Sequence, residues 1–179
     1  PEESDKYLAE ALSSIEAESA LSAEVYHAMA VTERKKDNPE LALQHISKAI
    51  DINTRFKAHS NLASNYYLAA SIYSKQDNFQ KAVEMLTLSV QEDRIEENSF
   101  GLAKDYKALG IVYLKNNKPE EAYSCFIKSY SIFRIIEGRQ EMAGVLQYLI
   151  EVSDRLDRPA DSAFFKEKLL ELSYNTGNK

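Results

Sequence analysis

The chain has 179 residues, a length that fits one compact domain or one short repeat array. Hydrophobic residues make up 44% of it and charged residues 28%, so a packed core can form and wholesale disorder is not expected. The net charge of −6 argues against a whole-surface role in binding nucleic acid or acidic membranes, because those partners require basic surfaces.

Few residues in the sequence break helices, since it contains only 5 glycines and 4 prolines. This composition favours helices over a turn-rich β fold. No stretch approaches the roughly 20 apolar residues of a membrane span, so direct membrane insertion is not expected. The chain starts at Pro1 without an initiator Met, and we expect that an N-terminal part, with any targeting signal or anchor, has been removed. The cytoplasm and the cell envelope both stay open as locations.

The first predicted element is an amphipathic helix over residues 5–18. Its apolar residues are Tyr7, Leu8, Ala11, Leu12 and Ile15. This helix either caps the rest of the chain or completes a hairpin whose first helix is missing. We assign residues 1–18 to an N-terminal capping segment.

A 40-residue repeat begins after this segment. One column of the repeat is identical in all four copies: Ala23, Ala63, Ala103 and Ala143. A second column, in the later half of each copy, reads Ala42, Ala82, Ala122 and Ser162. Within each copy the small and apolar residues recur three or four positions apart, which predicts two helices per copy. Each copy is therefore a helical hairpin that must stack on its neighbours to complete a core.

The register fixes the expected boundaries along the chain. The first helices of the hairpins are predicted over residues 19–36, 57–76, 97–116 and 137–156. The second helices are predicted over residues 39–53, 79–93, 119–134 and 159–174. The corresponding repeats span residues 19–58, 59–98, 99–138 and 139–179, the last with a C-terminal cap.

The third copy carries the most informative motif. It contains Tyr106, Leu109, Gly110, Tyr113, Ala122, Phe126 and Ser129. This pattern resembles the tetratricopeptide repeat, in a 40-residue form like that of spindle-orientation adaptors, kinesin light chains and bacterial peptide-sensing regulators. The resemblance implies an all-α fold, a right-handed superhelical α-solenoid of four such hairpins plus the N-terminal helix. It also implies a non-enzymatic scaffold that binds a protein or peptide partner.

In this family the first helices line a concave groove. Twenty positions of the first helices lie outside the core columns, and they carry seven basic and three acidic side chains, a net charge of +4. The groove is therefore expected to be electropositive and to bind a partner segment, specifically an acidic or carboxylate-bearing one. The predicted groove residues are His27, Arg34, Lys35, Tyr67, Ser71, Lys75, Lys104, Lys107, Ile111, Leu114, Lys115, Gln147 and Arg155.

Other interpretations of these residues stay open. A lysine or arginine in the last turn of a helix also interacts favourably with the helix dipole, so the basic column ending each first helix has a purely structural explanation. The carboxylate clamp of chaperone-binding family members is incomplete, because Val31 and Ala108 stand at two of its positions. One alternative function is an assembly subunit of a membrane transport or secretion complex that binds through its convex face or its ends. Another is that the groove holds a small ligand.

Catalysis is not expected from this sequence. The histidines do not have a metal-binding spacing, and no phosphate-binding loop or nucleophile motif is present. Cys125 is the only cysteine and lies beside Phe126, which favours a packed thiol over a nucleophile. No catalytic residue, metal site or cofactor is predicted.

Overall fold

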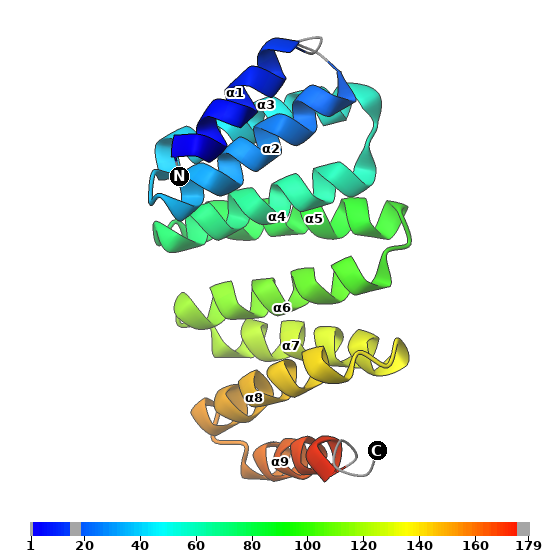
Figure 1. Ribbon diagram of the computed structural model, residues 1–179. Helices are drawn as coiled ribbons and strands as arrows, with labels where there is room; N and C mark the ends of the chain where they lie inside the picture. Colours follow the sequence, from blue (N-terminus) through cyan, green and yellow to red (C-terminus); the bar gives the residue numbers. More distant parts are fainter. Residues whose placement is uncertain (1, 15–18, 175–179) are drawn as a thin grey trace. The chain divides into compact units, whose positions relative to one another are not determined.

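The computed structural model of the protein describes residues 2–14 and 19–174 (Figure 1). This part of the chain forms nine α-helices and contains no strand. They are α1 (Glu2–Ser14), α2 (Ala20–Lys35), α3 (Pro39–Phe56), α4 (His59–Lys75), α5 (Phe79–Ile95), α6 (Ser99–Lys115), α7 (Pro119–Ile135), α8 (Arg139–Arg155) and α9 (Pro159–Tyr174). The prediction of an all-α solenoid of helical hairpins is confirmed.

The turns between the helices share one backbone conformation. A non-glycine residue with a positive φ follows each of the helices α2 to α8, at a regular spacing of half a repeat. These residues are Asp37, Lys57, Asp77, Glu97, Asn117, Glu137 and Asp157. In most of these turns the next N–H donates to the carbonyl five residues back, as from Asn78 to Tyr73 at 2.9 Å, which is the bond of a Schellman cap.

The helix boundaries differ from the predicted ones in a systematic way. The sequence predicts that three first helices begin at residues 57, 97 and 137, but α4, α6 and α8 begin two residues later. The reason is the left-handed residue at each of these positions, which ends the preceding helix. The second helices α3, α5 and α7 accordingly run one to three residues further than predicted.

The N-terminal helix also differs from its prediction. It begins at Glu2, three residues before the predicted start, and is described as far as Ser14. The predicted residues 15–18, with Ile15, lie outside the described residues, as does the side chain of Leu12. α1 packs on α2. Tyr7, which the sequence places on the apolar face, is 64% exposed.

The chain divides into two compact units, Pro1–Glu97 and Asn98–Lys179. In the first unit each helix packs on the next one, from α1 to α5. Its core is built from small and aliphatic side chains of α2, α3 and α4. The buried members are Ala30, Ala42, Ile46, Ala49, Leu68, Ala69 and Ile72.

The core of the second unit is more aromatic. Phe126 and Phe133 of α7 are fully buried, and the Phe126 ring stacks on Tyr148 of α8 with centroids 5.0 Å apart. In the last helix Phe165 is buried while Lys166 is exposed. In α9, Phe165 therefore packs into the core, whereas Lys166, which lies one repeat after the core residue Phe126, does not.

Small residues hold the two helices of a hairpin close together. The hydroxyl of Ser89 donates to the Ala63 carbonyl at 2.9 Å, and Ser129 repeats this bond to Ala103 at 2.8 Å. Because donor and acceptor shift together by one full repeat, the repeat preserves the contact as well as the fold. Gly110 of α6 lies directly against the Phe126 ring, where there is no room for a side chain.

Candidate binding surface

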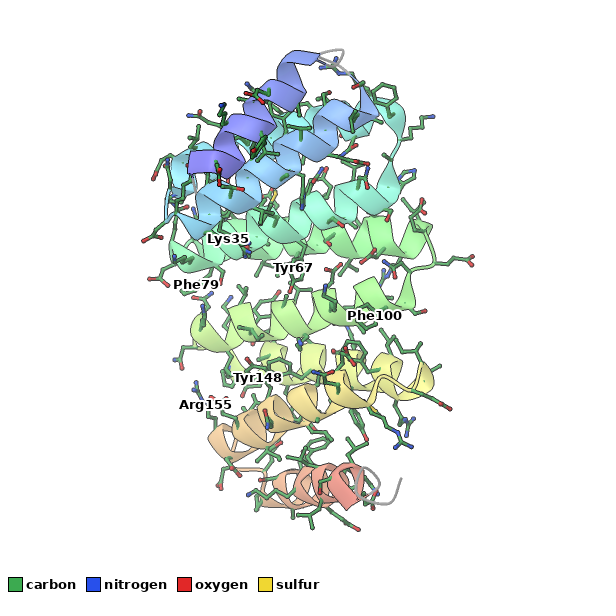
Figure 2. The ribbon with its side chains drawn as sticks, viewed as in Figure 1. Lys35, Tyr67, Phe79, Phe100, Tyr148 and Arg155 are labelled. Atoms are coloured by element: carbon green, nitrogen blue, oxygen red, sulfur yellow. The ribbon has the colours of Figure 1, made fainter. Side chains whose placement is uncertain are left out.

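In the first unit the predicted groove residues come from α2 and α4, which lie next to each other. Figure 2 labels Lys35 at the end of α2 and Tyr67 in the middle of α4. Lys35 is exposed, whereas Tyr67 is partly buried. This pair of first helices provides one continuous surface within the unit.

Polar bonds connect the two helices along this surface. Nδ1 of His27 lies 2.7 Å from Oδ1 of Asn65, and Arg34 donates to the Ser71 hydroxyl at 3.1 Å. The ammonium of Lys75 donates to the Asp37 carboxylate at 2.6 Å. Of the predicted groove residues, the structure thus brings Arg34 and Ser71 into contact. His27 and Lys75 instead contact Asn65 and Asp37, which the sequence did not assign to the groove.

These bonds change the expected electrostatics. Asp37 compensates the charge of Lys75, although both side chains are more than half exposed and such a pair stabilises the fold little. Arg34 keeps its full positive charge, because its partner Ser71 is neutral. The positive charge of this surface therefore lies mainly at Arg34 and Lys35.

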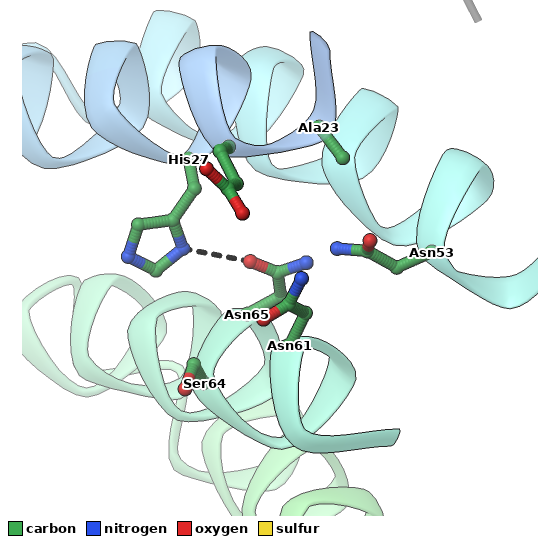
Figure 3. A pocket seen from close by; sticks show the side chains of 7 residues that line it. Ala23, His27, Asn53, Asn61, Ser64 and Asn65 are labelled. Atoms are coloured by element: carbon green, nitrogen blue, oxygen red, sulfur yellow. Dashed lines mark hydrogen bonds between the residues drawn. The ribbon is translucent and has the colours of Figure 1, made fainter. Parts of the chain in front are cut away.

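Two pockets open on this surface. One holds about 210 Å³ and is lined by Arg34, Asp37, Pro39, Ile72, Lys75 and Gln76. The other holds about 220 Å³ and lies between α2, α3 and α4 (Figure 3). Its lining residues are Ala23, Glu24, His27, Asn53, Asn61, Ser64 and Asn65.

In the second unit the predicted residues lie on α6 and α8. Lys107 is partly buried and Lys115 is exposed, while Arg155 donates to Glu151 at 2.7 Å. The ammonium of Lys104 lies 5.9 Å from the centroid of the Phe100 ring, a cation–π contact. Gln147, also predicted, is exposed on α8.

The two apolar groove residues of this unit have a different environment from the expected one. Leu114 is only 9% exposed and belongs to the core of the unit, so little of it is available to a partner. Ile111 packs against the same core and is partly exposed. The sequence predicts that Leu114 lies in the groove, but the packing of α6 buries this side chain in the core instead.

The sequence analysis did not identify Asn53 and Asn65, the two buried polar residues of the larger pocket. Asn53 is 2% exposed and Asn65 is 1% exposed. The available signal was a change of residue type within the repeat. These two positions are polar again one repeat later, at Asp93 and Asp105, but apolar two repeats later, at Phe133 and Val145.

Cys125 has the chemistry of a packed thiol, as its sequence context predicts. Burial raises the pKa of this thiol to about 11, so almost none of it is the nucleophilic thiolate at neutral pH. Within residues 2–14 and 19–174, no cluster of three potential metal ligands occurs. No helix in the same ranges has the length and apolar character needed to cross a membrane.

The sequence is similar to a known repeat family. Residues 21–91 match the family model described as tetratricopeptide repeat. A curated relative, response regulator aspartate phosphatase E of Bacillus subtilis, is 30% identical over 94 residues, which make up 51% of this chain. The chain spans only about a quarter (25%) of the length of that relative.

Solved structures share the fold at low sequence identity. BtubC from P. vanneervenii superposes with a TM-score of 0.86 at 13% identity, over 98% of this chain and 72% of that one. Aspartyl phosphate phosphatase F from Bacillus subtilis gives 0.84 at 12% identity, over 93% of this chain and 44% of that one. A Rap protein complexed with competence and sporulation factor gives 0.77 at 16% identity, over 93% and 46%. At such identities the likeness extends to the fold alone.

Proposed function

We propose that this chain, which belongs to the tetratricopeptide-repeat family, is a non-enzymatic scaffold that holds a segment of a partner protein on the surface of its first helices. One observation carries the proposal: polar side chains join α2 to α4, and two pockets open on the surface that these helices form. A surface that is polar, hollowed and linked across helices suits an extended segment with its own polar groups.

The charges on this surface favour an acidic segment. Arg34 is positive and bonded to a neutral hydroxyl, and Lys35 beside it is exposed. The second unit, considered by itself, also carries cations on a first helix, at Lys107 and Lys115 of α6. A carboxylate of the partner would gain a charge-assisted hydrogen bond from any of these side chains.

Charge reversal tests this proposal once affinity capture and mass spectrometry have identified a partner segment. If the first unit holds the segment, the variant Arg34→Glu with Lys35→Glu should weaken its binding at least ~10-fold by fluorescence anisotropy. If the second unit holds it, Lys107→Glu with Lys115→Glu should have this effect. Binding to the unaltered protein should also weaken as salt rises, because the contacts are exposed and screened. Circular dichroism should find the helices intact in each variant.

The matched control places the same change of charge on second helices. Arg55→Glu with Arg94→Glu alters two exposed last-turn residues of α3 and α5. This variant should bind the segment within about 2-fold of the parent. If it loses binding while both groove variants keep it, the partner uses the second-helix face, and the alternative of an assembly subunit becomes the better explanation.

A further inference from the structure

The pocket between α2, α3 and α4 has a polar floor made by two amides. Asn53 reaches in from α3 and Asn65 from α4, and their side chains point toward one another across the pocket (Figure 3). Both residues are almost fully buried. Glu24 and Ser64, which are exposed, stand at the rim on α2 and α4. The pocket therefore connects the groove surface with two buried polar groups.

Each of these amides has a buried polar atom without a partner among the described residues. Oδ1 of Asn53 accepts no hydrogen bond from them, and Nδ2 of Asn65 donates none to them. Nδ1 of His27 lies 2.7 Å from Oδ1 of Asn65, and because an amide oxygen can only accept, His27 donates from Nδ1 in this arrangement. The Asn65 NH2 group is thereby left without a partner among the described residues, and because its nitrogen is buried, a ligand in the pocket reaches it only when the side chain turns outward. A buried polar atom without a partner has lost its hydrogen bonds to water and gained none in return, so the unpaired arrangement is unfavourable.

The repeat itself shows that the fold does not require these amides. The positions one repeat after Asn53 and Asn65 are Asp93 and Asp105, and the positions two repeats after them are Phe133 and Val145. Phe133 and Val145 are fully buried in the core of the second unit. An apolar pair therefore completes the same joint between hairpins. The amide pair has a cost in stability that a role in recognition would explain.

The two unpartnered atoms define the group that fits between them. Asn65 offers a donor and Asn53 offers an acceptor, so the complementary group must both accept and donate. A carboxylate would face the Asn53 oxygen and the nearby Glu24 without a proton to share. An ammonium group would face the Asn65 N–H without a lone pair. A hydroxyl both accepts and donates, but it does so through a single oxygen. A carboxamide presents its acceptor oxygen and its donor NH2 group on two separate atoms, side by side, and it is neutral.

We propose that this pocket receives the side-chain carboxamide of a glutamine or asparagine on the bound partner segment. The carboxamide oxygen accepts from Asn65 Nδ2, and its NH2 group donates to Asn53 Oδ1. That the carboxamide belongs to a partner segment rests on the proposed function, whereas the chemistry of the pocket does not. The pocket adds a neutral specificity element to a surface whose other contacts are charged.

The test uses the full chain and a small probe, N-acetyl-glutamine N-methylamide. Its binding is followed by the side-chain NH2 signals of Asn53 and Asn65 in ¹⁵N–¹H correlation spectra. We expect saturable shifts with a Kd on the order of 1 mM, as for a ligand of this size. The glutamate, lysine and methionine derivatives should bind at least ~5-fold more weakly. No saturable shift, or equal binding of any of the other three, would overturn the proposal and leave a pocket filled by water.

Two variants replace Asn65 with side chains that the repeat already carries in this column. Asn65→Val removes the donor, and Asn65→Asp replaces it with an acceptor beside His27. Both should lose the glutamine probe at least ~10-fold, and Asn65→Asp should shift the preference to the lysine derivative. If either variant binds the glutamine probe as the parent does, Asn65 is not the donor and the proposal fails.

The outcome is separable from that of the proposed function. If the probe binds but charge reversal leaves partner capture unchanged, the carboxamide site is supported and the proposed binding of the partner through the charged groove residues is wrong. If charge reversal abolishes partner capture while the probe does not bind, the proposed scaffold function is supported and the proposed carboxamide site is wrong.

Discussion

Gly110 of α6 is the position where a single methyl group should separate two helices. A Cβ built there would lie 2.4, 2.6 and 2.8 Å from Cε1, Cδ1 and Cζ of the Phe126 ring. Favourable contacts between carbon atoms are about 3.5–4.0 Å long, so the overlap is roughly 1 Å. The ring has no free space to move into, because Phe126 is fully buried and lies 9° from parallel with Tyr148.

The expected effect of Gly110→Ala is the difference between two terms. Alanine is about 1 kcal/mol more favourable than glycine inside a helix. Overpacking a rigid core costs about 1–3 kcal/mol, because side chains leave their rotamers or helices shift. Here three ring atoms clash and the stacked partner of the ring would move too, so we expect the upper part of that range. The net loss is about 1–2 kcal/mol, or roughly 2–8 °C in Tm for a chain of this length.

Gly144 of α8 provides the matched control. It is also a helical glycine, but a Cβ built on it meets no atom within 4 Å. Gly144→Ala should therefore stabilise the protein by about 0.5–1 kcal/mol. Urea and thermal unfolding followed by circular dichroism at 222 nm measure both variants. Equal or greater stability of Gly110→Ala would refute the close approach of α6 to the Phe126 ring.

Four further predictions address other parts of the structure. Ala122→Leu adds bulk at a fully buried contact of α6 with α7 and should cost about 1–3 kcal/mol, and an unchanged melting curve would contradict this packing. Burial lowers the pKa of His45 below 6.5, so the unfolded chain binds its proton more readily and stability should fall as the pH drops below 6.5. His45→Gln should flatten this fall in urea unfolding at pH 7.5 and 5.5. With its pKa raised from 9.0 to about 11, Cys125 should react with a thiol reagent at pH 8 about 100-fold more slowly than in the unfolded chain. Lys57 has a φ of 52°, so Lys57→Gly should raise the free energy of unfolding by about 1 kcal/mol, seen as a higher Tm.

The helices could be predicted from the sequence because the 40-residue register repeats both apolar faces. The turns could be placed only approximately. Lys57, Glu97 and Glu137 adopt the left-handed conformation without being glycine or asparagine, so the sequence carries no local signal for the end of the helix. Their regular spacing becomes visible only with the backbone angles. The Schellman bonds that follow Lys57 and Glu137 compensate the strain of the residue type.

The sequence could predict which residues lie on the binding surface, but not which side chains they contact. Periodicity placed Arg34 and Lys75 on one face, yet it could not reveal that Asp37 of the preceding turn would reach Lys75. Nor could it reveal that Leu114 turns inward, because burial depends on the angle at which α6 meets its neighbours. The net charge counted from the predicted groove residues is therefore larger than the charge that this surface presents to a binding partner.

Matching positions of the repeat have different roles in the two units. At matching positions the first unit carries Asn53 and Asn65 around a polar pocket, and the second carries Phe133 and Val145 in a closed core. In a repeat array stability is close to a sum over units and their interfaces, so one joint can be suboptimal while the others hold the fold. The unpartnered amides therefore identify where this scaffold gives up stability, and recognition sites are drawn from such places. A ligand that pairs both amides would restore that stability on binding, which couples occupancy of the pocket to the rigidity of α2, α3 and α4.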